Sequence, residues 1–159
     1  AAAALASPQV SRLVVVEALA PVIDWHRRGL VPNGDALAGD PRCVFHQGDF
    51  FALTRGDGYD PQTVGRRFDA ILLDVDHTPD QLLNPSHADL YTVTGLERLK
   101  SLLNPGGVFA LWSNDAPETW FLDNLAKVFH RHEGHEVHFD NPLQGRTVSN
   151  GIYLAQRKN

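Results

Sequence analysis

Two carboxylates and an imidazole directly follow a run of aliphatic residues near the middle of the chain. The run spans residues 68–74 and is typical of a strand; it ends in Asp74, with Asp76 and His77 next. Carboxylates at a strand end are hydrogen-bond acceptors for the hydroxyl or amine groups of a ligand. An imidazole with a near-neutral pKa in such a loop is a candidate base. These residue types therefore predict ligand binding and proton transfer at the end of this strand.

Two further acids occupy the same position in other predicted strands. Glu17 ends the β-branched run at residues 12–17, and Asp49 follows a short apolar run at residues 42–46. Ligands of open parallel sheets bind outside the carboxyl ends of the strands, so three acids at three such ends favour a ligand site. The alternative is that each acid caps the N-terminus of a following helix.

Strand-like apolar runs alternate with helix-like segments along the chain. Aliphatic strands separated by helices are typical of a parallel, doubly wound α/β sheet, and two late strands with little helix between them indicate an antiparallel edge pair. We therefore predict a single Rossmann-like domain of three layers over residues 1–159. The expected strands are 12–17, 42–46, 68–74, 108–112, 136–139 and 151–155; the expected helices are 1–7, 19–28, 93–103 and 117–129; loops are expected at 31–40 and 56–66, and a turn at 104–107.

The composition argues against several classes of protein. The 14 Lys and Arg residues are outnumbered by 19 Asp and Glu residues, and the net charge of −5 gives no basis for binding nucleic acid. No apolar run reaches the about 18–20 residues that a membrane-spanning helix needs. The single cysteine, Cys43, cannot form an internal disulfide, which favours a reducing, cytoplasmic setting. The sequence contains no methionine, so we expect further residues upstream.

Four segments of the sequence are together similar to the S-adenosylmethionine-dependent methyltransferase fold. More narrowly, they resemble its spermidine-synthase-like (aminopropyltransferase) branch, and the resemblance runs from about residue 9 to residue 156. The D-P-R and G-D pattern followed by F-D-x-I-x-x-D is its more specific part, whereas N-P-G-G is common to many methyltransferase-like proteins. The segments are V-V-V-E-A at 14–18, D-P-R-C-V-F-H-Q-G-D at 40–49, F-D-A-I-L-L-D-V-D at 68–76 and L-N-P-G-G-V-F-A-L-W-S at 103–113.

The resemblance implies a role for each acid at a strand end. It implies that Glu17 holds the ribose hydroxyls of an adenosyl group, and that Asp49, with the amides around Phe50, reads the adenine amino group. Asp74 matches the acid that contacts the attacking amine in spermidine synthases and helps to remove its proton. The implied donor is S-adenosylmethionine or its decarboxylated form, and the implied acceptor is an amine-like or other small molecule.

The acceptor side departs from the family pattern. The family signature D-S-S-D-P is replaced here by D-V-D-H-T-P from residue 74, so the second acid, Asp76, is displaced by one residue and His77 stands in its place. Either Asp76 and His77 together accept a proton from a different nucleophile, or His77 caps the turn. Tyr91 falls in the segment that closes over the acceptor in the resembling family, and Trp112 is a candidate wall of that pocket.

The glycine-rich loop and the first strand of the family are absent from the sequence. That strand lies at the centre of the family's sheet, and without it the edges of its two neighbours carry unpaired backbone groups. We expect either an upstream segment or another chain to supply the strand, and the absence of methionine favours the upstream segment.

Other functions remain open. One is a non-catalytic module that binds adenosyl nucleosides, which the displaced acid and the absent glycine loop favour. Another is a nicotinamide-binding Rossmann domain, which shares the acid at Glu17, although N-P-G-G and Gly48-Asp49 count against it. The histidines between residues 130 and 138 lack the spacing of a metal motif and indicate a polar edge strand. The assembly state, a homodimer included, is open.

Overall fold

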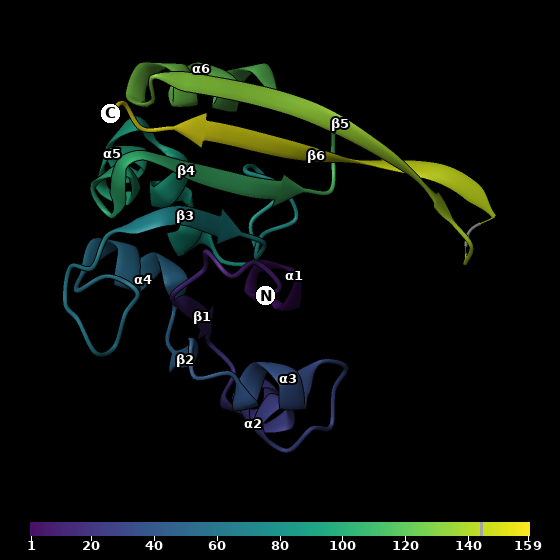
Figure 1. Cartoon of the computed structure of the whole chain (residues 1–159). Helices are drawn as coiled ribbons and strands as arrows, with labels where there is room; N and C mark the ends of the chain where they lie inside the picture. The colour runs from purple at the N-terminus through teal and green to yellow at the C-terminus, as the bar shows by residue number, and fades with distance from the viewer. Residues whose placement is uncertain (144) are drawn as a thin grey trace. The chain divides into compact units, whose positions relative to one another are not determined.

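The structure is a computed structural model that describes residues 1–143 and 145–159 (Figure 1). Strands and helices alternate as the sequence predicts, and the chain forms two compact units, Ala1–Arg66 and Arg67–Asn159. The first unit holds a sheet of two strands and the second a sheet of four. Among the described residues, no helix is both long enough and apolar enough to cross a bilayer.

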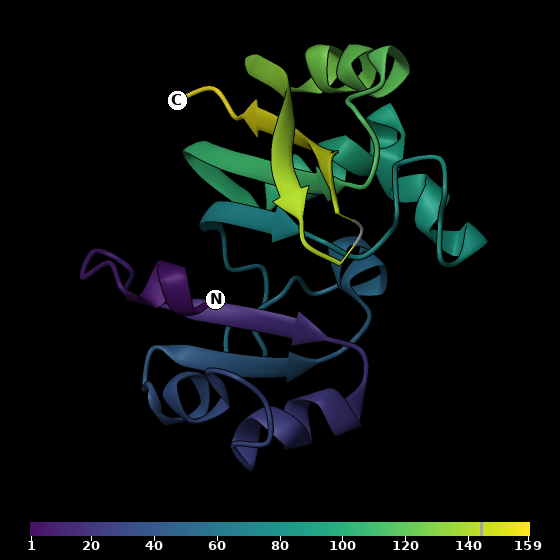
Figure 2. The ribbon, with the colours of Figure 1, turned by 90° about the vertical axis from the view of Figure 1, so that its right-hand side faces the viewer.

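A parallel pair of strands forms the centre of the first unit (Figure 2). Its register places Leu13 opposite Cys43 and Glu17 opposite Gln47. The side chains of these strands are mostly half-buried, and Gln47, at the end of β2, is exposed. The elements are α1 (Ala2–Leu5), β1 (Leu13–Glu17), α2 (Ala20–Arg27), α3 (Gly34–Gly39), β2 (Cys43–Gln47) and α4 (Phe50–Arg55).

A buried carboxylate fastens the loop after α4 to the strand pair. Arg12, at the start of β1, donates two hydrogen bonds of 2.6 and 2.8 Å to Asp60, and the guanidinium of Arg66 lies 2.7 Å from the same carboxylate. Burial acts to raise the pKa of Asp60. The hydrogen bonds from Arg12 and from the Gln62 amide outweigh it, so the pKa stays below its usual range.

The second unit contains a mixed sheet in the order β3–β4–β6–β5. Strands β3 and β4 are parallel, whereas β6 is antiparallel to both β4 and β5, which confirms the predicted antiparallel edge pair. The elements are β3 (Phe68–Leu73), the 3₁₀ helix η1 (Pro85–Tyr91), α5 (Val93–Ser101), β4 (Leu103–Ser113), α6 (Thr119–Val128), β5 (Arg131–Asn141) and β6 (Arg146–Gln156).

Each sheet has a strand that pairs along one edge only. Within the described residues, β1 pairs with β2 alone and β3 pairs with β4 alone. The resemblance predicted open edges on the two neighbours of the strand that is absent from this sequence, and which strands these are stays a prediction.

The two faces of the four-stranded sheet differ in how deeply they are buried. Side chains on one face form the core with α5 and α6, and Phe109, Leu111 and Tyr153 are at most 2% exposed. On the other face, Leu72 is 72% exposed and Trp112 is 36% exposed. The aliphatic run at residues 68–73 is therefore buried on alternate residues only.

Several elements differ from the predicted boundaries. Helix α3 lies within the expected loop at 31–40. It begins and ends at a glycine, and Leu37 between them in the sequence is buried. Strand β4 includes the expected turn at 104–107, because the ladder with β3 shifts register there and Gly106 adopts a φ of +74°, which favours glycine. Strands β5 and β6 are much longer than expected and extend as a two-stranded ribbon beyond the end of β4 (Figure 1).

Candidate functional site

The first unit brings the two acids predicted to bind the donor to the same end of its strand pair. Glu17 is the last residue of β1 and lies opposite Gln47, two residues before Asp49. The Gly48 amide donates a 3.0 Å hydrogen bond to the Glu17 carbonyl, which continues the pairing past the end of β2. Both acids therefore lie at the carboxyl end of the parallel pair, where ligands of such sheets bind.

Both carboxylates also cap local backbone. Glu17 accepts a 2.7 Å hydrogen bond from the Leu19 amide, and Asp49, the N-cap of α4, accepts one of 3.0 Å from the Ala52 amide. In each carboxylate one oxygen accepts this hydrogen bond. The second oxygen accepts none from the described part of the chain. Capping and ligand binding are therefore compatible at both residues.

An aromatic pair supports the start of α4. The ring of Phe50 stacks on Tyr59 with centroids 4.6 Å apart, and the Tyr59 hydroxyl hydrogen-bonds Thr54 at 2.7 Å. Burial raises the pKa of Tyr59, so its phenol stays protonated. The Phe50 ring is half-buried against Tyr59, whereas its amide, in the first turn of α4, has no intrahelical acceptor.

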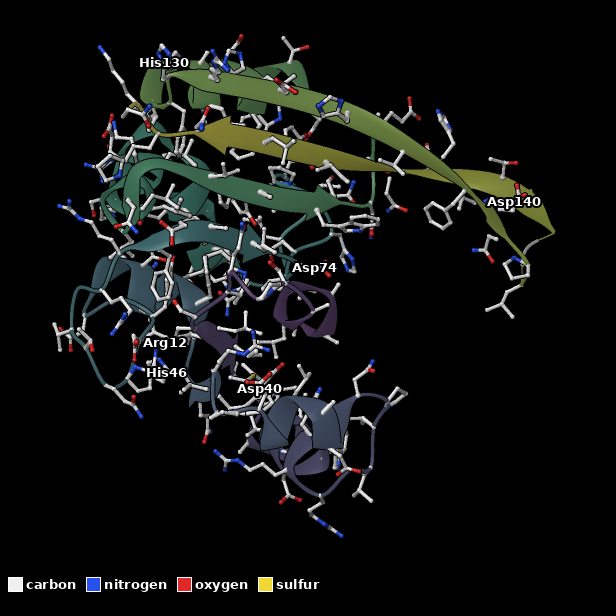
Figure 3. The ribbon with its side chains drawn as sticks, in the orientation of Figure 1. Arg12, Asp40, His46, Asp74, His130 and Asp140 are labelled. Atoms are coloured by element: carbon white, nitrogen blue, oxygen red, sulfur yellow. The ribbon has the colours of Figure 1, made fainter. Side chains whose placement is uncertain are left out.

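In the second unit, Asp74 and Asp76 lie in opposite environments. Asp74 directly follows β3 (Figure 3) and is exposed, and the described residues show no hydrogen bond or ion pair to its carboxylate. The side chain of Asp76 is 1% exposed and accepts 2.8 Å hydrogen bonds from the Leu83 amide, His87 Nδ1 and the Tyr91 hydroxyl. Asp74 is available to a ligand, whereas Asp76 ties the segment after β3 to η1.

His77 is exposed and contacts a different partner from Asp76. Its carbonyl accepts a 2.7 Å hydrogen bond from the Asn114 amide, and its Nδ1 lies 3.2 Å from Asn114 Nδ2. No hydrogen bond links Asp76 to His77 among the described residues. The geometry therefore favours the second of the two interpretations of His77, in which it fastens the turn after β3, here to the turn after β4.

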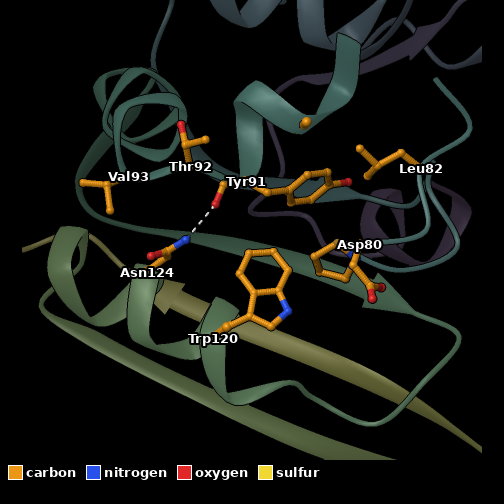
Figure 4. A pocket seen from close by; sticks show the side chains of 9 residues that line it. Asp80, Leu82, Tyr91, Thr92, Val93, Trp120 and Asn124 are labelled. Atoms are coloured by element: carbon orange, nitrogen blue, oxygen red, sulfur yellow. Dashed lines mark hydrogen bonds between the residues drawn. The ribbon is translucent and has the colours of Figure 1, made fainter. Parts of the chain in front are cut away.

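A cavity of about 490 Å³ lies between η1 and α6, within the second unit (Figure 4). Tyr91, predicted to belong to a lid, is buried and forms one wall, and burial together with its bond to Asp76 raises the pKa of its phenol. Trp112, the other predicted wall, lies on the open face of the sheet and does not line this cavity. The lining residues are Pro79, Asp80, Leu82, Ala88, Tyr91, Thr92, Val93, Trp120 and Asn124.

Sequence reasoning missed several residues of this region. His87 was missed because its partner Asp76 lies 11 residues earlier, a spacing that no helix or strand pattern connects. Trp120 and Asn124 are four residues apart on α6, a spacing that places them on one helical face and is a usable signal. Asp80, although close to the acids after β3, had no pattern to distinguish it from a turn residue.

Comparisons with known proteins identify the fold. No family model and no curated protein sequence matches the chain. A spermidine synthase bound to the transition-state analogue AdoDATO has a similar structure, with a TM-score of 0.66 and 18% identity over 96% of this chain and 49% of its own. Spermidine synthase from Thermotoga maritima also has a TM-score of 0.66, with 19% identity over 96% of this chain and 48% of that one.

A methyltransferase is also similar to the chain. Human methyltransferase-like protein 13, solved with SAH, has a TM-score of 0.56 and 20% identity over 92% of this chain and 61% of its own. This chain spans about half the length of the two spermidine synthases. The chain thus has the Rossmann-like α/β fold that spermidine synthases share with S-adenosylmethionine-dependent methyltransferases.

Proposed function

We propose that this chain is a transferase domain that moves a methyl or aminopropyl group from an S-adenosylmethionine-type sulfonium donor to an amine-like or other small molecule. The observation that carries the proposal is the placement of Glu17, Asp49 and Asp74 at the carboxyl ends of parallel strands in this fold. The similar structures were solved with an adenosyl transition-state analogue or with SAH, which supports a donor of this class.

The residues at the end of the first unit's strand pair fit an adenosyl group. The oxygen of Glu17 that is not bonded to Leu19 is an acceptor for ribose hydroxyls, and the corresponding oxygen of Asp49 is an acceptor for the adenine amino group. The Phe50 amide supplies a donor beside Asp49, at the N-terminal end of α4.

On the acceptor side, Asp74 is the residue that we assign to proton transfer. When bound, the sulfonium supplies an activated carbon whose leaving group is a neutral thioether. The chain then has to align the nucleophile and keep it unprotonated. Asp74 suits this role because its carboxylate is exposed at the strand end and makes no hydrogen bond or ion pair within the described chain. Asp76 then acts by fixing the segment after β3, and His77 by holding the adjoining turn.

Calorimetric titration of the chain with methylthioadenosine, S-adenosylmethionine and decarboxylated S-adenosylmethionine tests the donor site. We expect binding, weakened about tenfold or more by Glu17→Gln and by Asp49→Asn, because each substitution replaces a charged acceptor with a neutral amide. The preferred ligand separates methyl transfer from aminopropyl transfer. Absence of binding by all three, repeated with a chain extended by any upstream coding sequence, would contradict the proposal.

The Asp74→Asn variant tests the acceptor side. We expect it to retain donor affinity and to lose turnover by about 10²- to 10⁴-fold, the usual contribution of a positioned base. Its melting temperature should match the wild type, since the Asp74 carboxylate makes no hydrogen bond or ion pair with the residues that the structure describes. Asp76→Asn is the matched comparison: it should lower the melting temperature, because its carboxylate holds three donors.

A non-catalytic adenosyl-binding module is the second candidate. The burial of Asp76 favours it, because the second acid of the acceptor side is taken up by internal hydrogen bonds. Such a module would bind the donor with unchanged affinity in Asp74→Asn, but the wild type would show no turnover with any acceptor.

A further inference from the structure

The cavity between η1 and α6 has the size and lining of a small-molecule site. Its volume of about 490 Å³ falls within the roughly 300–1,000 Å³ that is usual for such sites. Apolar side chains make up most of its wall, and Trp120, which is 40% exposed, presents its indole to the space (Figure 4). This lining fits a ligand with an apolar or aromatic body.

Most of the polar groups that line the cavity already have hydrogen-bond partners. The Tyr91 hydroxyl donates to Asp76, and Asn124 Nδ2 donates to the Tyr91 carbonyl. The Thr92 hydroxyl donates to the carbonyl of Asp89 and accepts from the amide of Gly95. These groups shape the cavity but are poorly placed to select a polar ligand.

Asp80 is the exception. It is exposed, and it is the only charged side chain among the described residues that line the cavity. One of its oxygens accepts a hydrogen bond from the Thr78 hydroxyl, and no bond to the other oxygen is recorded in the described chain. A carboxylate with a free oxygen beside an apolar space pairs best with a ligand cation, because charge-assisted hydrogen bonds are the stronger ones.

The N-terminal ends of α5 and α6 border the cavity at Val93 and Trp120, and their partial positive charge disfavours a bound cation. Their effect is the smaller one. Each helix start carries only about half an elementary charge, partly offset at α5 by the Thr92 cap, whereas Asp80 carries a full charge. The Trp120 ring adds a cation–π surface on the same wall.

We infer that this cavity binds an organic monoamine, with its ammonium paired to Asp80 and its apolar body against Trp120. A diamine would bring a second ammonium into a space where the described lining residues supply no second carboxylate, and Asp76 nearby is buried and bonded to three donors. The inference is independent of the proposed function, because it does not make the monoamine the acceptor whose proton Asp74 removes. The binding itself needs no donor.

Titration of the chain with phenethylamine, in the absence of any donor, tests the inference. We expect phenethylamine to bind at least tenfold more tightly than 2-phenylethanol, 3-phenylpropionate or 1,4-diaminobutane. Fluorotryptophan labelling gives the location, because the ¹⁹F resonance of Trp120 should shift on binding while that of Trp25 should not.

Two variants sharpen the test. Asp80→Asn should weaken phenethylamine binding at least tenfold, whereas Asp123→Asn, which removes an exposed acid on α6 outside the cavity, should leave it unchanged. Absence of phenethylamine binding, tighter binding of the diamine, or equal affinity in Asp80→Asn would overturn the inference. Binding of adenosyl compounds is measured separately, so this result and the fate of the proposed function stay distinguishable.

Discussion

The two compact units differ in what lies at their centres. Among the described residues, sixteen buried apolar residues belong to the second unit and five to the first, and every large side chain below 2% exposure is in the second. In the first unit the Asp60 carboxylate, 0% exposed, lies between Arg12 and Arg66. Apolar packing is insensitive to pH, whereas an ion pair depends on protonation. We therefore expect the stability of the two units to respond differently to mutation and to acid.

Arginine contacts with backbone carbonyls extend this difference. Arg42 pairs with Asp40 and also donates to the carbonyls of Leu5, Ser7 and Val10, which ties α1 to the start of β2. A small unit with few buried apolar residues gains order from such directed contacts. Fluorotryptophan labels report on each unit in one sample, since Trp25 lies in the first and Trp112 and Trp120 in the second.

The largest expected effect is in the apolar core of the second unit. Leu73→Ala should lower the free energy of unfolding reported by Trp120 by about 2–5 kcal/mol, because Leu73 is 3% exposed and its loss leaves a cavity. Leu72→Ala is the matched control on the same strand: Leu72 is 72% exposed, and the change should be within about 0.5 kcal/mol. Equal losses in a urea titration would show that the open face is covered in solution.

A somewhat smaller effect is expected at the buried ion pair of the first unit. Asp60→Ala should cost about 2–4 kcal/mol in the transition reported by Trp25, because it leaves Arg12 and Arg66 without their shared carboxylate. This loss of stability is smaller than the largest losses for fully buried ion pairs, because the side chains of Arg12 and Arg66 are 22% and 39% exposed and water screens their charges. Asp57→Ala, an exposed acid in the same loop, is the control and should change little. An unchanged Trp25 transition in Asp60→Ala would show that the ion pairs of Asp60 do not stabilise the first unit.

The smallest expected effect is the pH dependence of the first unit. The pKa of Asp60 is lower in the folded chain than in the unfolded chain, so its stabilisation is complete above the unfolded pKa of about 3.9 and is lost as the pH falls through the folded pKa. Unfolding of the wild type, followed at Trp25 between pH 5 and pH 2, should therefore become easier toward acid. Asp60→Asn should flatten this dependence. A slope that survives in Asp60→Asn would assign it to other carboxylates.

The order and type of the elements could be predicted because they depend on local patterns. Runs such as 12–17 and 68–73 contain enough β-branched and aliphatic residues to specify strands. Helix α3 was missed because Pro32, Asn33 and two glycines predict a loop more strongly than its short apolar stretch predicts a helix. The helix is stabilised by the burial of Leu37, which is a tertiary contact. The lengths of β5 and β6 were missed because their polar residues show no burial pattern, and backbone pairing alone extends these strands.

The site was only partly predictable for a related reason. The positions of Glu17, Asp49 and Asp74 follow from the rule that strand ends bind ligands, and their roles stay predictions. The contrast between Asp74 and Asp76 does not follow from the sequence, because it depends on His87 and Tyr91 folding back from η1. Asp76 is therefore buried, although it lies only two residues after the exposed Asp74.

The β5–β6 ribbon has a consequence for the order in which the second unit folds. Its eleven-residue strands pair as a hairpin, in which each contact closes a short stretch of chain. Hairpins form on the order of microseconds, whereas the pairings of β4 with β3 and with β6 both join residues that are much further apart in the chain. We expect the ribbon to acquire protection from hydrogen exchange first during refolding, before β4 pairs with β3 and with β6.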